Sequence, residues 1–300
     1  MEEKNRSNDL LSIGAINVGW RGILMCMAEQ DHDHEDDFHG RVDDGDEPWP
    51  DEFDLPDGPA EASQAAAGET YWSLSRAPLE SLVFTMPLVL AYEGGVLLLG
   101  RGSPRNGADV WLRGLLDSLG FGAYFLLPAL TVVGLLAWHH VEHDRWAFRP
   151  GVLAAMGLES VVLAAMLLGI ARLQARVWPD VLAQMQVGVE DAGLLRRLIG
   201  FCGAGLYEEV LFRLLLFPVV AWGFRLAGWS AATGIMASIL LTSLLFSAAH
   251  YVGPLGDRFE LYSFTFRSLA GMFFAVLFCV RGFGITAGTH AAYDMLVGLF

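Results

Sequence analysis

The feature that most constrains this chain is a series of long apolar runs that fill its larger, C-terminal part. Short loops between these runs carry most of the charged side chains of that part. About twenty helical residues span the ~30 Å hydrocarbon core of a bilayer, so each run is a candidate membrane helix. Residues 76–300 are therefore predicted to form an all-α, polytopic membrane helix bundle. We expect about seven transmembrane helices, at residues 79–100, 119–138, 151–173, 203–224, 231–252, 262–280 and 284–300.

The charge of the chain lies almost entirely in one segment. The net charge is −15, and residues 29–70 hold 16 acidic side chains and one basic side chain. A segment so rich in Asp, Glu, Pro and Gly cannot bury enough apolar surface to offset the entropy of ordering it. We therefore predict a weakly apolar N-terminal segment at 1–28 and a disordered acidic segment at 29–75. No stretch concentrates positive charge, which excludes nucleic-acid binding through a basic face.

Ionisable residues inside the apolar runs are the best guide to function. Each costs roughly 2.5–3.5 kcal/mol at the centre of a membrane helix. Such residues are kept where they face a cavity or a partner, and they mark a functional site by default. The chain offers Glu93, Glu159, Glu208, Glu209, Arg213, His250, Arg267, His290 and Asp294.

The first group of these residues lies in the sequence YEEVLFR, residues 207–213. Glu209 and Arg213 are four residues apart, so on a helix they share a face and can form an ion pair. Glu208 is rotated by about 100° from Glu209 and stays free to act as a general base. The alternative is a salt bridge that joins two helices, with Glu208 exposed near the membrane surface.

Two further groups lie on later helices. His250 closes an apolar helix four residues after Phe246, where a hydrogen-bonded core histidine is the simpler interpretation. His290 and Asp294 are again four apart, a spacing that lets a carboxylate orient the imidazole ring. A helix-internal hydrogen bond near the membrane surface is the alternative. Three helices that each carry such polar residues together favour one buried site.

The order EExxxR, FxxxH and HxxxD/N on successive apolar helices resembles the CPBP intramembrane protease family. This family includes the type II CAAX prenyl endopeptidases and the bacterial Abi-type, bacteriocin-processing-like members. The resemblance covers residues 203–300, and the last position of the third motif is Asp294 where the family often has Asn. The matching residues are Glu208, Glu209, Arg213, Phe246, His250, His290 and Asp294.

The resemblance implies an intramembrane endopeptidase that hydrolyses peptide bonds of membrane-embedded or membrane-associated substrates. In one version Glu208 and His250 activate a water molecule, and His290 and Asp294 steady the oxyanion. Glu209, Arg213 and Phe246 then support the site. In a second version Glu208, His250 and His290 bind a divalent metal, most plausibly zinc, which activates the water. We favour the version without a cofactor, because the chain has no HExxH ligand pair.

A non-proteolytic membrane protein is the alternative function. A proton or ion transporter, or an interaction scaffold, could use the same buried carboxylates and histidines. Under either function we expect an integral, multi-pass protein of the plasma or inner membrane. Its partners are the lipid bilayer and a peptide or protein substrate, and they include no nucleic acid.

Other polar residues fit simpler interpretations. The cluster of His139, His140, Glu142, His143 and Asp144 is predicted to be a polar loop at the membrane surface rather than a metal site. Glu93 and Glu159 are expected to line the site cavity or to mark helix ends. Arg267 is expected to pair with an acidic residue, for which Glu159 is the first candidate.

Overall fold

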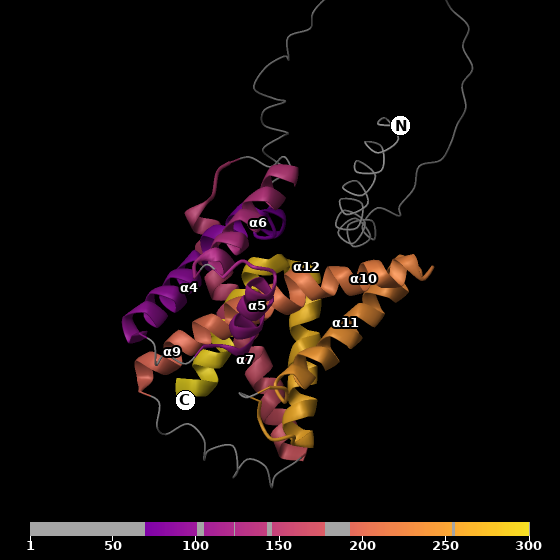
Figure 1. The fold of residues 1–300 in the computed structure, drawn as a ribbon. Helices are drawn as coiled ribbons and strands as arrows, with labels where there is room; N and C mark the ends of the chain where they lie inside the picture. The colour runs from indigo at the N-terminus through magenta and orange to yellow at the C-terminus, as the bar shows by residue number, and fades with distance from the viewer. Residues whose placement is uncertain are drawn as a thin grey trace, which may run out of the picture.

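The computed structural model of the protein describes residues 70–100, 105–122, 124–142, 146–177, 193–253 and 256–299. Within these ranges the chain is helical and contains no strand (Figure 1). The predicted all-α fold is therefore confirmed. The predicted segment at 1–28 and nearly all of the acidic segment at 29–75 lie outside the described residues. The last few residues of that second segment include a short helix.

Each predicted apolar run contains a helix, although several boundaries differ. Four of the helices, α4, α7, α11 and α12, are long and apolar enough to cross a membrane, and α6 is a shorter apolar helix. The described elements are α3 (Tyr71–Leu74), α4 (Pro78–Leu99), α5 (Gly107–Ser118), α6 (Leu126–Glu142), α7 (Pro150–Val177), α9 (Leu194–Gly203), η4 (Ala204–Glu208), η5 (Val210–Leu216), α10 (Phe217–Leu226), α11 (Ala231–Ala249) and α12 (Leu261–Leu299).

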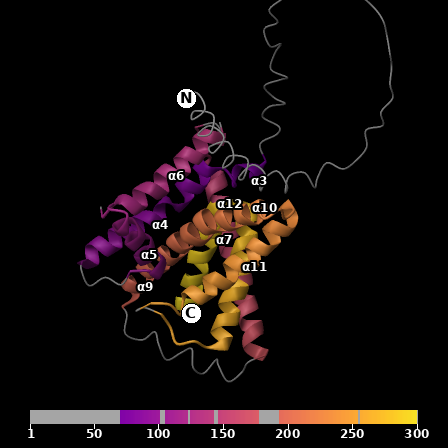
Figure 2. The same cartoon turned by 45° about the vertical axis from the view of Figure 1, so that its right-hand side comes forward.

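The helix that carries the first motif is longer than predicted. We expected it at 203–224, but α9, η4, η5 and α10 follow one another without a break, and Figure 2 shows α9 and α10 as the two ends of one long helix. Its middle, η4 and η5, is π-helical. Pro218 at the start of α10 has no N–H to donate to the preceding turn, which favours an irregular ladder just before it. Such π-helical stretches are frequent at functional sites.

The last two predicted helices, 262–280 and 284–300, are the two halves of α12. They meet at Gly282, whose backbone is non-helical with φ 79° and ψ −179°. A β-carbon there would lie 3.3 Å from the Cα of Arg76, and this positive φ is costly for any residue except glycine. The predicted interruption is therefore confirmed, although it is a kink rather than a loop.

The helices pack around α12. Its neighbours are α7, α11, η4 and α4, while α4 also packs against α6 (Figure 1). Large apolar side chains such as Leu90, Leu98, Val162 and Met236 are exposed on α4, α7 and α11, whereas several charged side chains are buried. Apolar surface outside and polar groups inside is the pattern of a protein surrounded by lipid. We conclude that this is an integral membrane protein.

Candidate active site

The two adjacent glutamates of the first motif point in different directions. Glu209 is fully buried, and its Oε2 lies 3.0 Å from Nε of Arg213. The other oxygen, Oε1, lies 2.6 Å from Nδ1 of His290. The predicted pair of Glu209 with Arg213 is thus present. Glu209 also connects this helix to the second half of α12.

Arg213 is held among aromatic rings. Its Nη2 donates to the carbonyl oxygen of Gly271 at 3.1 Å. Its guanidinium carbon lies 4.7 Å from the ring centre of Phe246, and Phe274 lies on the same group at 5.6 Å. Phe246 in turn makes an edge contact with the ring of His250 at 5.0 Å. The position of the Phe246 side chain between a cation and a histidine gives the FxxxH spacing a packing role.

Glu208 has one engaged oxygen and one free oxygen. Oε1 accepts a hydrogen bond from Nδ2 of Asn106 at 2.8 Å. Oε2 lies 3.8 Å from Nε2 of His250 and 3.8 Å from Nε2 of His290. These separations exceed a direct hydrogen bond, and a water molecule can bridge polar groups at such a distance. The side chain of Glu208 is 12 % exposed, so it is not completely enclosed by the bundle.

His250 is oriented by its own helix. It follows the last residue of α11, and its Nδ1 lies 2.8 Å from the carbonyl oxygen of Phe246. A carbonyl oxygen only accepts hydrogen bonds, so Nδ1 carries the hydrogen. In the neutral ring, Nε2 is then an acceptor that faces Glu208. The backbone carbonyl of His250 also accepts from the N–H of Asp257 at 2.8 Å, which fixes the following turn.

The third motif is arranged differently from the expectation. Asp294 lies 3.8 Å from Nε2 of His290, whereas Glu209 makes the close contact at Nδ1. Phe274 stacks on the His290 ring with centroids 4.5 Å apart. The ring is thus oriented mainly by Glu209 and Phe274. The i, i+4 spacing predicted that Asp294 orients the ring of His290. The close contact instead comes from Glu209, which lies on another helix.

Asn106 and a network beside it were missed by the sequence analysis. The loop after the first apolar run contains α5, and Asp109 on this helix is fully buried rather than solvated. Asp109 pairs with Arg105 at 2.7 Å and with Arg113 at 2.5 Å. The one available signal was an Asn-Gly pair before an amphipathic stretch, which is typical of a helix start.

Glu93 and Glu159 belong to two separate networks. Glu93 accepts hydrogen bonds from Tyr207 at 2.5 Å and from Arg113 at 2.8 Å, next to the first motif. Glu159 pairs with Arg281 at 2.6 Å. The expected pairing of Arg267 with Glu159 is therefore wrong.

Two other expectations also differ from the structure. Arg267 pairs with Asp257 at 2.6 Å. His139 is buried in the last turn of α6, against Trp146, rather than in a surface loop. His143 and Asp144 lie outside the described residues.

A metal ion would require Glu208, His250 and His290 to direct their ligand atoms at one point. Among the residues that the structure describes, no group of three or more His, Cys, Asp or Glu side chains has an arrangement suited to a metal ion. His290 directs Nδ1 at Glu209, so only Nε2 of each histidine faces Glu208. The placement of Glu208, His250 and His290 is thus looser than that of a ready metal site.

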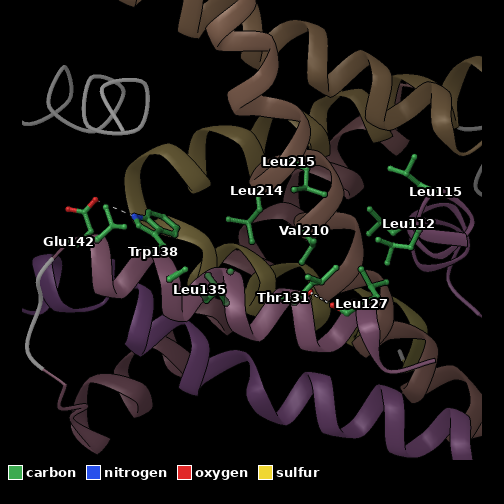
Figure 3. Close-up of a pocket in the computed structure, with 15 residues that line it drawn as sticks. Leu112, Leu115, Leu127, Thr131, Leu135, Trp138, Glu142, Val210, Leu214 and Leu215 are labelled. Atoms are coloured by element: carbon green, nitrogen blue, oxygen red, sulfur yellow. Dashed lines mark hydrogen bonds between the residues drawn. The ribbon is translucent and has the colours of Figure 1, made fainter. Parts of the chain in front are cut away.

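An apolar groove of about 520 Å³ lies between α5, α6 and η5 (Figure 3). Its walls are mainly leucines, among them Leu112, Leu127 and Leu214. Trp138 and Glu142 lie at one end of it (Figure 3). Val210, which directly follows Glu209, also lines the groove, so groove and candidate site share one helix.

Comparison with known proteins agrees with the three motifs. No curated protein and no solved structure matches the chain. Residues 191–296, about a third of the chain, match the family model described as Rce1-like, type II CAAX prenyl endopeptidase Rce1-like. The match includes all seven motif residues. Residues 191–296 of this integral membrane protein are therefore similar to the Rce1-like type II CAAX prenyl endopeptidases, in agreement with the resemblance to the CPBP proteases.

Proposed function

We propose that the protein is an intramembrane endopeptidase in which Glu208 is the general base. The observation that carries the proposal is the free oxygen of Glu208, which lies 3.8 Å from Nε2 of His250 and from Nε2 of His290. Two imidazole nitrogens thus lie at the same distance from one carboxylate oxygen. We propose that water bridges Glu208 and these histidines, in reach for proton transfer.

The proposed reaction uses these groups as follows. Glu208, assisted by His250, takes a proton from the water as its oxygen attacks the carbonyl carbon of the peptide bond. The new C–O bond forms, and the carbonyl oxygen becomes an oxyanion that the protonated His290 steadies, while Asp294 supports the positive charge on the His290 ring. Glu208 then gives the proton to the leaving amine as the C–N bond breaks.

His290 needs help to stabilise an oxyanion. With Nδ1 donating to Glu209, Nε2 can donate only when the ring is protonated. Glu208, Glu209 and Asp294 lie around the ring and stabilise that positive charge. Arg213 balances Glu209 from its other side. We propose that Glu209, Arg213 and Phe246 hold the histidine and do not touch the substrate.

The groove gives the proposal a substrate class. A leucine-lined channel that shares a helix with Glu209 suits the apolar part of a membrane-associated peptide, either a lipid group or a transmembrane segment. The family description names CAAX prenyl substrates, so prenylated C-terminal peptides belong in the first assay. We propose entry from the lipid through this groove.

The test uses full-length protein purified in detergent and treated with a chelator. Wild type, Glu208→Gln and His250→Ala are compared on a library of membrane peptides with and without prenyl groups. Hydrolysis that survives the chelator and is lost in both variants would support the metal-free version.

Zinc, if held by Glu208, His250 and His290, would supply an activated water. Activity that is lost to chelator and restored by zinc would support that version instead. A wild-type protein that cleaves none of these peptides would favour the transporter or scaffold.

A further inference from the structure

Asn106 lies 102 positions before Glu208 in the chain, yet its amide Nδ2 donates to Glu208 Oε1 at 2.8 Å. It is the residue that precedes α5. We propose that Asn106 is the positioning residue of Glu208. It occupies Oε1, so that Oε2 alone faces the two imidazole rings. This inference rests on the proposed function, in which Glu208 is the general base.

The orientation of the Asn106 amide is fixed by its other end. Oδ1 accepts a hydrogen bond from the N–H of Ala108 at 2.8 Å, which makes Asn106 the N-cap of α5. An amide nitrogen cannot accept this bond, so the oxygen must face Ala108 and the nitrogen must face Glu208. The capping bond therefore points the only strong donor of the side chain at the carboxylate.

The backbone of Asn106 is also anchored independently of Glu208. Its N–H donates to the hydroxyl of Tyr92 at 3.1 Å, and that hydroxyl donates to Oδ2 of Asp109 at 2.9 Å. Tyr92 and Asp109 are fully buried, and Arg105 and Arg113 neutralise Asp109. A donor held by a satisfied, buried network is preorganised for its acceptor. The network thus fixes Asn106 first and Glu208 through it.

Two substitutions separate this role from helix capping. Asp and Ser cap helices about as well as Asn, so Asn106→Asp and Asn106→Ser keep the α5 cap. Both remove the amide donor, and Asp in addition places a negative charge against Glu208. Ser230→Ala is the matched control. The Ser230 side chain caps α11 by accepting a hydrogen bond from the N–H of Thr233, so this substitution removes a helix cap and leaves the Asn106–Glu208 contact intact.

The first readout does not depend on catalysis. Full-length protein in detergent is treated with dicyclohexylcarbodiimide, which reacts with protonated carboxyl groups, and the labelled positions are read by mass spectrometry. A hydrogen bond to the carboxylate opposes protonation, so losing it should raise the labelling rate of Glu208 about tenfold in Asn106→Ser. The rise should be larger in Asn106→Asp. Glu209, which keeps Arg213 and His290, serves as the internal control and should not change.

The second readout is peptide hydrolysis by the same samples. We expect kcat to fall about tenfold or more in both Asn106 variants, with KM within about twofold, because the base is misplaced and the groove is intact. Ser230→Ala should keep wild-type kcat.

Each outcome decides one of the two proposals. Equal Glu208 labelling in wild type and Asn106→Ser overturns the positioning role, whatever the activity. Altered labelling of Glu208 in a protein that hydrolyses no peptide keeps the role of Asn106 and removes the proposed function.

Discussion

Gly205 is a point of close approach between α12 and the helix that carries both glutamates. A β-carbon at this position would lie 2.6 Å from the Cβ of Ala291 and 2.6 Å from its backbone nitrogen. Carbon atoms pack at about 3.5 Å or more, so Gly205→Ala must push the two helices apart by about 1 Å. Ala291 directly follows His290, and the displacement therefore acts on the site.

The expected size of the effect follows from this shift. Nδ1 of His290 and Oε1 of Glu209 are 2.6 Å apart, and a displacement of about 1 Å takes them beyond hydrogen-bond distance. A misplacement of that size can cost about 100-fold in rate. Overpacking of this kind costs only about 1–3 kcal/mol of stability. We predict that Gly205→Ala lowers kcat about 100-fold while the protein still folds.

The assay measures peptide hydrolysis and thermal unfolding on the same detergent-solubilised samples, at a temperature well below the Tm of the variant. Gly200→Ala is the control, because it lies on the same continuous helix and its β-carbon would meet nothing within 4 Å. It should keep wild-type activity and gain slightly in Tm. A Gly205→Ala protein with kcat within twofold of wild type would refute the reasoning, since the helices would then separate without moving His290.

The remaining predictions concern the buried charge and the groove. Glu209→Ala should cost about 3–5 kcal/mol because it leaves Arg213 buried without a counter-ion, whereas Asp257→Ala, which removes an exposed ion pair, should cost less than about 1 kcal/mol. Equal losses in unfolding experiments would contradict the buried pair. Leu214→Trp should fill the groove and raise KM for apolar peptides at least about fivefold, while Leu240→Trp on an exposed face of α11 should not. The same KM in both variants would show that substrate does not use the groove.

The sequence predicted the parts of the fold and the site that depend on local spacing. Apolar runs of membrane-spanning length indicated the helices, because burying a polar backbone in lipid leaves few alternatives to a helix. Glu209 and Arg213 were expected to pair because residues four apart share a helix face. The break between the two halves of α12 was also expected, and glycine at position 282 permits it.

The parts that the sequence did not predict depend on contacts across the bundle. Asn106 reaches Glu208 only because α5 packs on the helix that contains η4, and no local pattern links residues 102 positions apart. From the sequence, Asp109 resembles a surface charge in a polar loop. In the structure it contacts Arg105, Arg113 and the buried Tyr92. Arg281 and Glu159 are 122 positions apart and pair across the contact between α12 and α7, which no local spacing indicates.

The two glutamates are adjacent in the chain, and their surroundings explain why one should act and the other should support. Glu209 has both oxygens engaged, one near Arg213 and one at His290, in a position without solvent exposure. Protonation of Glu209 would weaken its ion pair with Arg213 and its contact with His290. Glu208 is held at one oxygen by a neutral amide, and its other oxygen meets the open Nε2 faces of two histidines. A general base needs a carboxylate that is held in place by one oxygen and free to accept a proton at the other. In this chain a rotation of about 100° between neighbouring helical residues separates this role of Glu208 from the supporting role of Glu209.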